Sequence, residues 1–324
     1  MGRCGQLSAL TGWWGGIILK LPGVGSMAIL VVGGTGQLGG RVVALLQGRG
    51  EVVRCLVRAE TDDSGLRAAG VEIVRGDLTD PISLPGACAG VTVVVATATV
   101  IARRLAGARH PTMREVDEDG MTALVDAAER AGVERFVYVS YAGAGKGQGS
   151  PLEHAKVAVE RRLATSTMRT VIVRPDAFQE VHLGPLGRFD LAARKVSIIG
   201  KGTNPVRWVS TDDVAALLAA VAVEADPPAL IEVGGPEALS RNEAADVAER
   251  ALGRTIKRQH LARWLARVGL VVFRRSNDAV SVVFGAGLAQ DLIRVTWDDS
   301  PLRERGIAPR SASDFIKAQA AALR

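Results

Sequence analysis

A cluster of glycines over residues 33–39 has the residue types and the spacing that suit nucleotide chemistry. Glycines allow a tight turn and a close backbone approach, and a helix that follows them presents free N–H groups to a pyrophosphate. The apolar run Ala28–Val32 before the cluster and the helical pattern Gly39–Gln47 after it supply the required context. A glycine turn without a ligand is the alternative. The expected dinucleotide-binding residues are Gly33, Thr35, Gly36, Gln37, Leu38 and Gly39.

The residue that follows the expected second strand, Val52–Val57, distinguishes NAD from NADP. An NAD site has Asp or Glu about 20 residues past the loop, where the carboxylate accepts a hydrogen bond from the ribose 2′-hydroxyl. Arg58 stands there instead, and its planar guanidinium suits a 2′-phosphate. We therefore expect NADP(H), with NADPH favoured over NADH; a solvated surface arginine is the alternative.

Apolar strands alternate with amphipathic helices along the chain, which indicates βαβ units and a parallel sheet. Two helices carry Ser…Glu capping boxes at their starts, at Ser150 with Glu153 and at Ser240 with Glu243. Further strands are expected at Val71–Val74, Val91–Ala96, Arg135–Ser140 and Thr170–Val173, with a helix over Gly120–Ala131. The predicted fold class is α/β, a Rossmann-type doubly wound parallel sheet with a smaller, mainly helical C-terminal portion on the substrate side.

Three parts of the chain follow from this pattern. Residues 1–26 precede the first strand and are expected to be a disordered N-terminal extension. Residues 27–178 are the expected NAD(P)-binding core. Residues 179–324 are the expected substrate-side portion, from which some strands and helices return to the core.

The cysteines and histidines narrow the class of protein. Cys4, Cys55 and Cys88 are scattered without paired spacing, and the four histidines form no metal-ligand motif. This usage predicts a reducing compartment, no disulfide framework and no metal site. Because no run of about 18 apolar residues occurs, no membrane span is expected. We expect a cytoplasmic protein.

Residues 254–275 contain seven basic residues and no acidic one. A helix here could lie on an anionic membrane surface or bind an acidic partner, or it could be a solvated basic face packed on its own domain. Nucleic-acid binding is not expected, because basic charge is confined to this stretch with little aromatic interleaving. A helical arrangement separates Arg263, Arg267 and Arg274 from Leu261, Trp264, Leu265 and Val268.

Several segments together resemble the atypical short-chain dehydrogenase/reductase superfamily, especially its NmrA-like and related NAD(P)H-binding branches. The resemblance implies that Asp77 and Leu78 lie near the adenine, that Ala96 and Thr97 line the nicotinamide side, and that Phe178 begins the substrate side. The matching segments are Leu30–Gly39, Gly76–Leu78, Val125–Ser140, Lys156, Arg174–Pro175, Asp212–Ala215 and Gly234–Pro236.

The catalytic device that this resemblance implies is a tyrosine four residues before a lysine, assisted by a serine. Lys156 and Ser140 fit the lysine and the serine, but neither Tyr138 nor Tyr141 has a lysine at that spacing. A lysine at the edge of an apolar stripe needs a partner. The resemblance implies contact with the nicotinamide ribose, and an i,i+4 pair with Glu160 is the alternative. For Ser140, a hydroxyl that caps the strand end is the alternative.

The sequence therefore predicts NADPH-dependent reduction of a small hydrophobic substrate of quinone or enone type, with a small molecule or a protein as partner. The alternative is a non-catalytic NADP(H)-binding module, acting as a redox sensor or as an assembly or accessory subunit. The missing tyrosine ranks nucleotide-sugar epimerase or dehydratase chemistry last.

Overall fold

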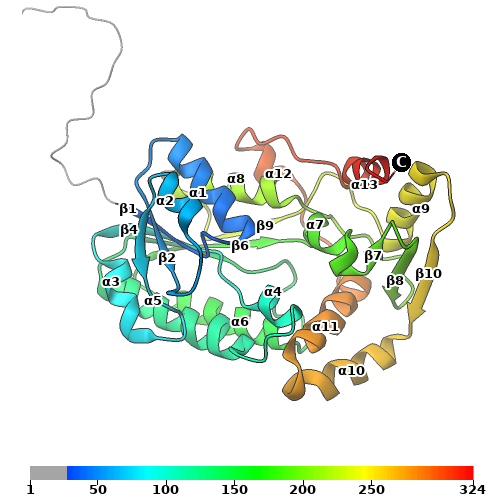
Figure 1. Cartoon of the computed structure of the whole chain (residues 1–324), viewed down its shortest axis with the longest axis horizontal. Helices are drawn as coiled ribbons and strands as arrows, with labels where there is room; N and C mark the ends of the chain where they lie inside the picture. The colour runs from blue at the N-terminus through cyan, green and yellow to red at the C-terminus, as the bar shows by residue number, and fades with distance from the viewer. Residues whose placement is uncertain (1–27, 324) are drawn as a thin grey trace, which may run out of the picture.

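A seven-stranded parallel sheet forms the centre of the molecule (Figure 1). The computed structural model describes residues 28–323, so the expected extension over residues 1–26 lies outside the described residues. The strand order β3-β2-β1-β4-β5-β6-β9 confirms the predicted doubly wound α/β class. The strands are β1 (Ala28–Val32), β2 (Val53–Val57), β3 (Glu72–Arg75), β4 (Val91–Ala96), β5 (Arg135–Val139), β6 (Arg169–Pro175) and β9 (Leu230–Val233).

Helices cover both faces of this sheet because successive strand residues point to opposite sides. In β1, Ile29 and Val31 pack under α1 and α8, whereas Leu30 and Val32 pack against the other layer. The two layers are visible on either side of the sheet in Figure 1. The first layer holds α1 (Gln37–Gly48) and α8 (Thr211–Val223); the second holds α3 (Leu84–Cys88), α4 (Ile101–Leu105), the π-helix η2 (Arg114–Gly120), α5 (Met121–Arg130) and α6 (Pro151–Leu163).

The chain after β6 builds a smaller portion around a second sheet, in the order β10-β8-β7. Its own apolar core includes Trp208, Phe189 and Ile316. Helix α8 packs on the large sheet, and strand β9 forms its edge beside β6. The remaining elements are α2 (Ser64–Ala68), η1 (Pro81–Ser83), α7 (Gln179–His182), η3 (Pro185–Gly187), β7 (Phe189–Asp190), β8 (Lys195–Ile199), α9 (Arg241–Leu252), β10 (Lys257–Leu261), α10 (Arg263–Ser276), α11 (Asp278–Leu292), α12 (Ser300–Arg303) and α13 (Ala312–Ala321).

The helix starts agree with the predicted caps in part. Ser240 and Glu243 form the full capping box of α9. Ser150 caps α6, but the Glu153 carboxylate accepts hydrogen bonds from the N–H groups of Gly147 and Gly149 instead of Ser150. The box predicted at Ser150 and Glu153 is therefore wrong in its Glu half, because the preceding glycine loop folds back over the helix start. Over residues 28–323, no helix is both long and apolar enough to cross a membrane.

Candidate functional site

The carboxyl edge of the large sheet brings together residues that are far apart in the sequence. Gly33 follows β1, Arg58 follows β2, Asp77 lies beyond β3, Thr97 follows β4 and Ser140 follows β5. These strands are neighbours and run parallel, so their carboxyl ends share one edge. Doubly wound sheets bind their ligands at this edge.

Two glycines of the loop leave no room for a side chain. Gly33 has a φ of +99°, and a Cβ atom there would lie 2.7 Å from Thr97 Oγ1. A Cβ atom on Gly39 would lie 2.2 Å from the carbonyl oxygen of Gly33. The N–H of Gly36 donates to the same carbonyl at 2.9 Å. The loop is therefore a compact turn that only glycine can form at positions 33 and 39.

Helix α1 starts directly behind this turn, with Gly36 at its N-cap and no side-chain cap. The backbone N–H groups of Gln37, Leu38 and Gly39 donate to no acceptor within the described part of the chain. Thr35 is exposed at the tip of the turn. Free N–H groups and the positive end of the helix dipole together make this terminus a suitable pyrophosphate site.

Arg58 carries an available cation at the end of β2. Its backbone carbonyl accepts a hydrogen bond from Arg75 Nη1 at 2.8 Å, while its guanidinium has no partner among residues 28–323. Arg54, four residues earlier, is different: it donates to the carbonyl of Ala87 and pairs with Glu72. Of these two arginines, only Arg58 is free to bind a ligand phosphate.

Beyond β3 and β4, the remaining predicted residues are held by local contacts. The Asp77 carboxylate accepts hydrogen bonds from the N–H and the hydroxyl of Thr79, both at 2.9 Å. Leu78 is buried, and its carbonyl lies against Gly120 of η2. The Thr97 hydroxyl donates to the carbonyl of Val32 at 3.1 Å, which ties the end of β4, with buried Ala96, to the glycine loop. Their contacts with adenine and nicotinamide stay predictions.

Lys156 lies inside the protein, with 7% of its surface exposed. Its Nζ donates to the carbonyl of Val139 at 2.9 Å and lies 4.8 Å from the centre of the Tyr138 ring. The alternative pair with Glu160 is wrong, because the Glu160 carboxylate accepts from Arg174 Nε at 2.9 Å. Lys156 is therefore directed to the end of β5, as a lysine at the reactive edge would be.

Asp117, which no sequence motif indicated, lies beside Lys156. It is fully buried on η2, and its Oδ1 lies 4.0 Å from Lys156 Nζ. Burial raises the pKa of Asp117 and lowers the pKa of Lys156, and the opposite charge of each group partly offsets this effect for the other. Within the acidic run 115–119, nothing in the pattern separates Asp117 from its neighbours.

Three buried oxygen atoms around Lys156 have no hydrogen-bond partner in the described chain: Asp117 Oδ1, Tyr138 Oη and Ser140 Oγ. Tyr138 and Ser140 are two residues apart on one strand and its extension, so they share a face. Ser140 Oγ makes no cap at the strand end, which removes the alternative reading of this serine. Buried polar atoms without partners are costly, and a hydroxyl-rich ligand would satisfy them. These atoms and the glycine turn fit a nicotinamide dinucleotide.

A small apolar cluster lies near the ends of β5 and β6, where the substrate side is expected. Ala142, Ile293 and Trp297 form a buried cluster there. The Trp297 indole N–H donates to the Asp176 carboxylate at 2.9 Å, which anchors the C-terminal segment beside β6. Phe178 packs on the core and pairs with Val209 in a short bridge, so its expected role on the substrate side stays a prediction.

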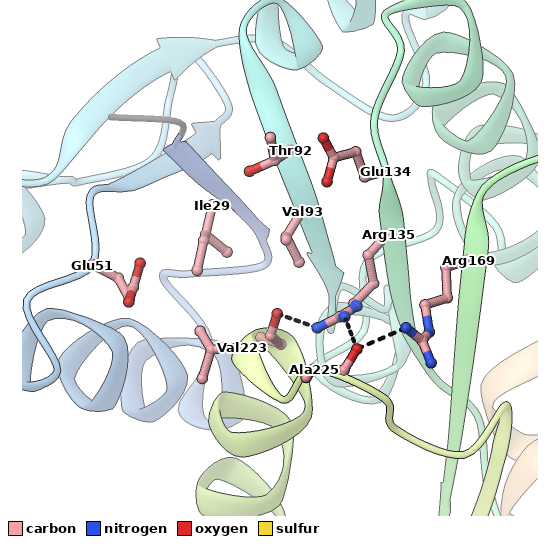
Figure 2. A pocket seen from close by; sticks show the side chains of 10 residues that line it. Ile29, Glu51, Thr92, Val93, Glu134, Arg135, Arg169, Val223 and Ala225 are labelled. Carbon is pink, nitrogen blue, oxygen red and sulfur yellow. Dashed lines mark hydrogen bonds between the residues drawn. The ribbon is translucent and has the colours of Figure 1, made fainter. Parts of the chain in front are cut away.

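A hollow of about 480 Å³ lies at the opposite edge of the sheet (Figure 2). It is lined by the amino ends of the strands, including Ile29, Val93 and Arg135. Figure 2 shows Arg135 and Arg169 converging on the carbonyl of Ala225, to which both donate hydrogen bonds. Because the glycine turn lies at the carboxyl edge, this hollow is not the dinucleotide site.

Comparison with known proteins agrees with this geometry. The NAD(P)H azoreductase of Xenophilus azovorans is 29% identical over 301 residues, which cover 91% of this chain and 99% of the relative. The photosystem II assembly factor Ycf39 of Synechocystis sp. is 31% identical over 229 residues, covering 70% and 68%. The NADPH-dependent quinone oxidoreductase QOR2 of Escherichia coli shares the fold, with a TM-score of 0.70, 20% identity and coverage of 90% and 99%.

A family model described as NAD(P)H-binding matches residues 33–225, which include the glycine turn, Arg58 and Lys156. This match confirms the resemblance that the sequence motifs indicated. The chain belongs to the NAD(P)H-binding family.

Proposed function

We propose that this protein is an NADPH-dependent reductase of a small, hydrophobic, electron-poor substrate such as a quinone or an enone, in the NmrA-like branch of the atypical short-chain dehydrogenases/reductases. The observation that carries the proposal is the buried Lys156, grouped with the unpaired Ser140 hydroxyl at the edge that holds the glycine turn. The apolar cluster of Ala142, Ile293 and Trp297 supports an apolar substrate beside it.

The unpaired guanidinium of Arg58 favours NADPH over NADH. Two carboxylates beyond the end of β2 have local partners: Asp63 binds Arg67 and Arg75, and Asp62 accepts from the backbone of Ser64. Both acids are thus engaged in local structure. Arg58 can meet a 2′-phosphate with charge-assisted hydrogen bonds.

Bound NADPH would supply the hydride. Lys156 and Ser140 would orient the cofactor by donating hydrogen bonds from the end of β5. Burial lowers the pKa of the Lys156 ammonium, so this group releases a proton more readily than an exposed lysine. The product proton comes from water, Lys156 or Ser140, and the reaction needs no tyrosine acid. Quinones and enones suit such a site, because hydride addition to them gives a delocalised anion.

A second candidate is a non-catalytic NADP(H)-binding module, either a redox sensor or an assembly subunit. Two observations favour it: no tyrosine precedes Lys156 at the usual spacing, and the relatives include proteins named photosystem II assembly factor. We also propose a cytoplasmic location, supported by the buried free thiols of Cys55 and Cys88.

Calorimetric titration with NADPH and NADH, followed by NADPH oxidation with a panel of quinones and enones, separates the two candidates. A reductase loses at least about 100-fold in turnover on Lys156→Met and still binds NADPH, because general acid–base groups contribute about that much or more. The exposed Lys195→Met is the matched control. If the protein binds NADPH tightly but reduces no compound of the panel, the non-catalytic module is the better assignment and the reductase proposal is wrong.

The cofactor preference has its own test. Arg58→Gln should weaken NADPH binding about 10-fold or more and leave NADH binding unchanged, since one charge-assisted hydrogen bond contributes about 1.5–3 kcal/mol. Arg130→Gln, at an exposed arginine on α5, is the control. If the substitution weakens NADPH and NADH binding equally, Arg58 does not bind the 2′-phosphate.

A further inference from the structure

Helix α10 has two apolar stripes on opposite faces. The inner stripe, with Ala266, Gly269 and Leu270, packs on α11. Contact is close: a Cβ atom on Gly269 would lie 2.5 Å from the Phe284 ring, and the Ser281 hydroxyl donates to the carbonyl of Leu270 at 2.8 Å. The inner stripe thus fixes α10 to α11, which lies between α10 and the rest of the molecule in Figure 1.

The outer stripe points to solvent. Its members lie at positions i, i+1, i+4, i+7 and i+8, which share one helical face. Val271 is 67% exposed and Trp264 is 65% exposed. No other helix of the described chain carries as many exposed large apolar residues. The outer stripe consists of Trp264, Leu265, Val268, Val271 and Val272.

Arginines border this stripe. Arg263, Arg267 and Arg274 lie along one side of the helix, and Arg275 lies at its end. Arg263 pairs with the Asp291 carboxylate, and Arg274 contacts only a ring nitrogen of His154, at 3.3 Å. Arg267 and Arg275 have no acidic partner among residues 28–323. No acidic residue occurs from position 254 to 277.

We propose that α10 is an interfacial helix that binds the surface of an anionic lipid membrane. A helix of 14 residues is about 21 Å long, too short to span a bilayer but suited to lie in its surface. The outer stripe enters the boundary between headgroups and acyl chains, where tryptophan is favoured. Arg267 and Arg275 reach the lipid phosphates while their aliphatic stems cover apolar surface.

Charge distinguishes this occupant from a second copy of the chain. An antiparallel two-fold pair of outer stripes would place the two arginine rows on the same side, and only Arg263 of each row has a carboxylate partner, Asp291. An anionic bilayer neutralises Arg267 and Arg275, which have no acidic partner among residues 28–323. An ordinary solvated basic face, the alternative that the sequence left open, would not have five large apolar residues that point outward.

The test is co-sedimentation of the full-length protein with vesicles of phosphatidylcholine, with or without phosphatidylserine. We expect binding only when phosphatidylserine is present, and weaker binding as salt rises. Arg267→Gln with Arg275→Gln should weaken binding roughly 25-fold, at about fivefold for each arginine near the surface. Trp264→Ser with Val271→Ser should weaken it at least about 10-fold. Both double variants change only exposed residues, so they should fold like the wild type.

Matched controls separate membrane binding from folding and from the reductase. Ile82→Ser replaces an apolar residue that is 90% exposed outside α10, and Arg130→Gln with Arg161→Gln removes two exposed charges. These controls should bind vesicles like the wild type. All variants should keep the NADPH affinity and melting temperature of the wild type.

Several outcomes would overturn the proposal. They are equal binding to neutral and anionic vesicles, no binding to either, or α10 variants that bind like the controls. Sedimentation equilibrium without lipid gives a further check: a dimer that the Trp264→Ser, Val271→Ser protein converts to a monomer would assign the stripe to a second copy. Capture of an acidic peptide with no vesicle binding would assign it to a protein partner.

Discussion

Substitution of Gly39 by alanine tests the geometry of the glycine turn directly. A Cβ atom at this position would lie 2.2 Å from the Gly33 carbonyl oxygen and 2.7 Å from Thr97 Oγ1. Real Cβ atoms essentially never come closer than 3.0 Å to such neighbours, so the carbonyl must move by about 1 Å. The carbonyl belongs to the backbone of the turn, so the binding loop itself is displaced.

The expected loss of NADPH affinity follows from this displacement. A displacement of binding groups by about 1 Å can cost about 100-fold. We therefore expect NADPH affinity to fall about 100-fold, which corresponds to about 2.7 kcal/mol of binding free energy. Isothermal titration calorimetry measures the Kd, and circular dichroism measures the melting temperature in the same buffer. Unfolding free energy should also fall, by about 1–3 kcal/mol, because the new methyl group overpacks a tight contact.

Gly48→Ala is the matched control in the same helix. A Cβ atom at Gly48 meets nothing within 4 Å, and its φ is not positive. This variant should bind NADPH like the wild type and should be equally or slightly more stable, because alanine is the better helix former. A Gly39→Ala protein that binds NADPH within about threefold of the wild type would refute the reasoning, since about threefold is well under 1 kcal/mol.

Two further predictions concern the link between the helical C-terminal portion and the large domain, and the effect of pH. Asp278→Ala should lower the free energy of unfolding, measured by urea denaturation, by about 3–5 kcal/mol, because the buried guanidinium of Arg104 would lose its counter-charge. Asp278 accepts hydrogen bonds from Arg104 Nε at 2.6 Å and from the Met113 N–H at 2.8 Å. A decrease of less than about 1 kcal/mol would contradict this prediction. Burial and nearby Arg241 lower the pKa of His182 from 6.5 to about 4. The unfolded chain therefore takes up this proton at higher pH than the native state, and stability falls by at most about 3 kcal/mol as pH drops from about 6.5 to 4. In the His182→Gln protein, the unfolding free energy should fall less over this pH range. If its pH dependence is the same as in the wild type, His182 is not the cause of the fall.

The strands and the cofactor turn could be predicted because their signals are local. Ala28–Val32 is apolar at every position, as a strand covered on both faces must be. The glycine spacing of the turn is read within seven residues. Arg58 could be placed at the edge because the end of its strand is marked by the change from Leu56-Val57 to a charged residue.

The partners of Lys156 could not be predicted, because they come from two elements other than its own helix. Helix α6 supplies the lysine, β5 supplies the Val139 carbonyl, and η2 supplies Asp117, 39 positions earlier in the sequence. Glu160, one turn away, was the only partner visible to helical spacing. It binds Arg174 on β6 instead, since the two side chains meet across the sheet face at 2.9 Å.

In residues 254–275, the part that depends on local spacing could be predicted, and the part that depends on a distant strand could not. Its helical face was predicted at Trp264, Leu265 and Val268, which lie on the outer side of α10. Leu261 was assigned to this face wrongly, because it ends β10. That strand forms by pairing with β8, which lies some 60 residues earlier in the sequence, and helical periodicity carries no information about such a partner.

The position of Tyr138 explains how the site differs from one with a tyrosine acid. Its ring lies beneath Lys156, at 4.8 Å, and its hydroxyl is fully buried without a partner in the described chain. Burial and the nearby Asp117 charge raise its pKa well above the usual value, so it is a poorer proton donor than an exposed tyrosine. The lysine that would normally lower a tyrosine pKa is here directed toward Asp117 and the Val139 carbonyl. Under the proposed reductase function, substrates that require a tyrosine proton are therefore disfavoured.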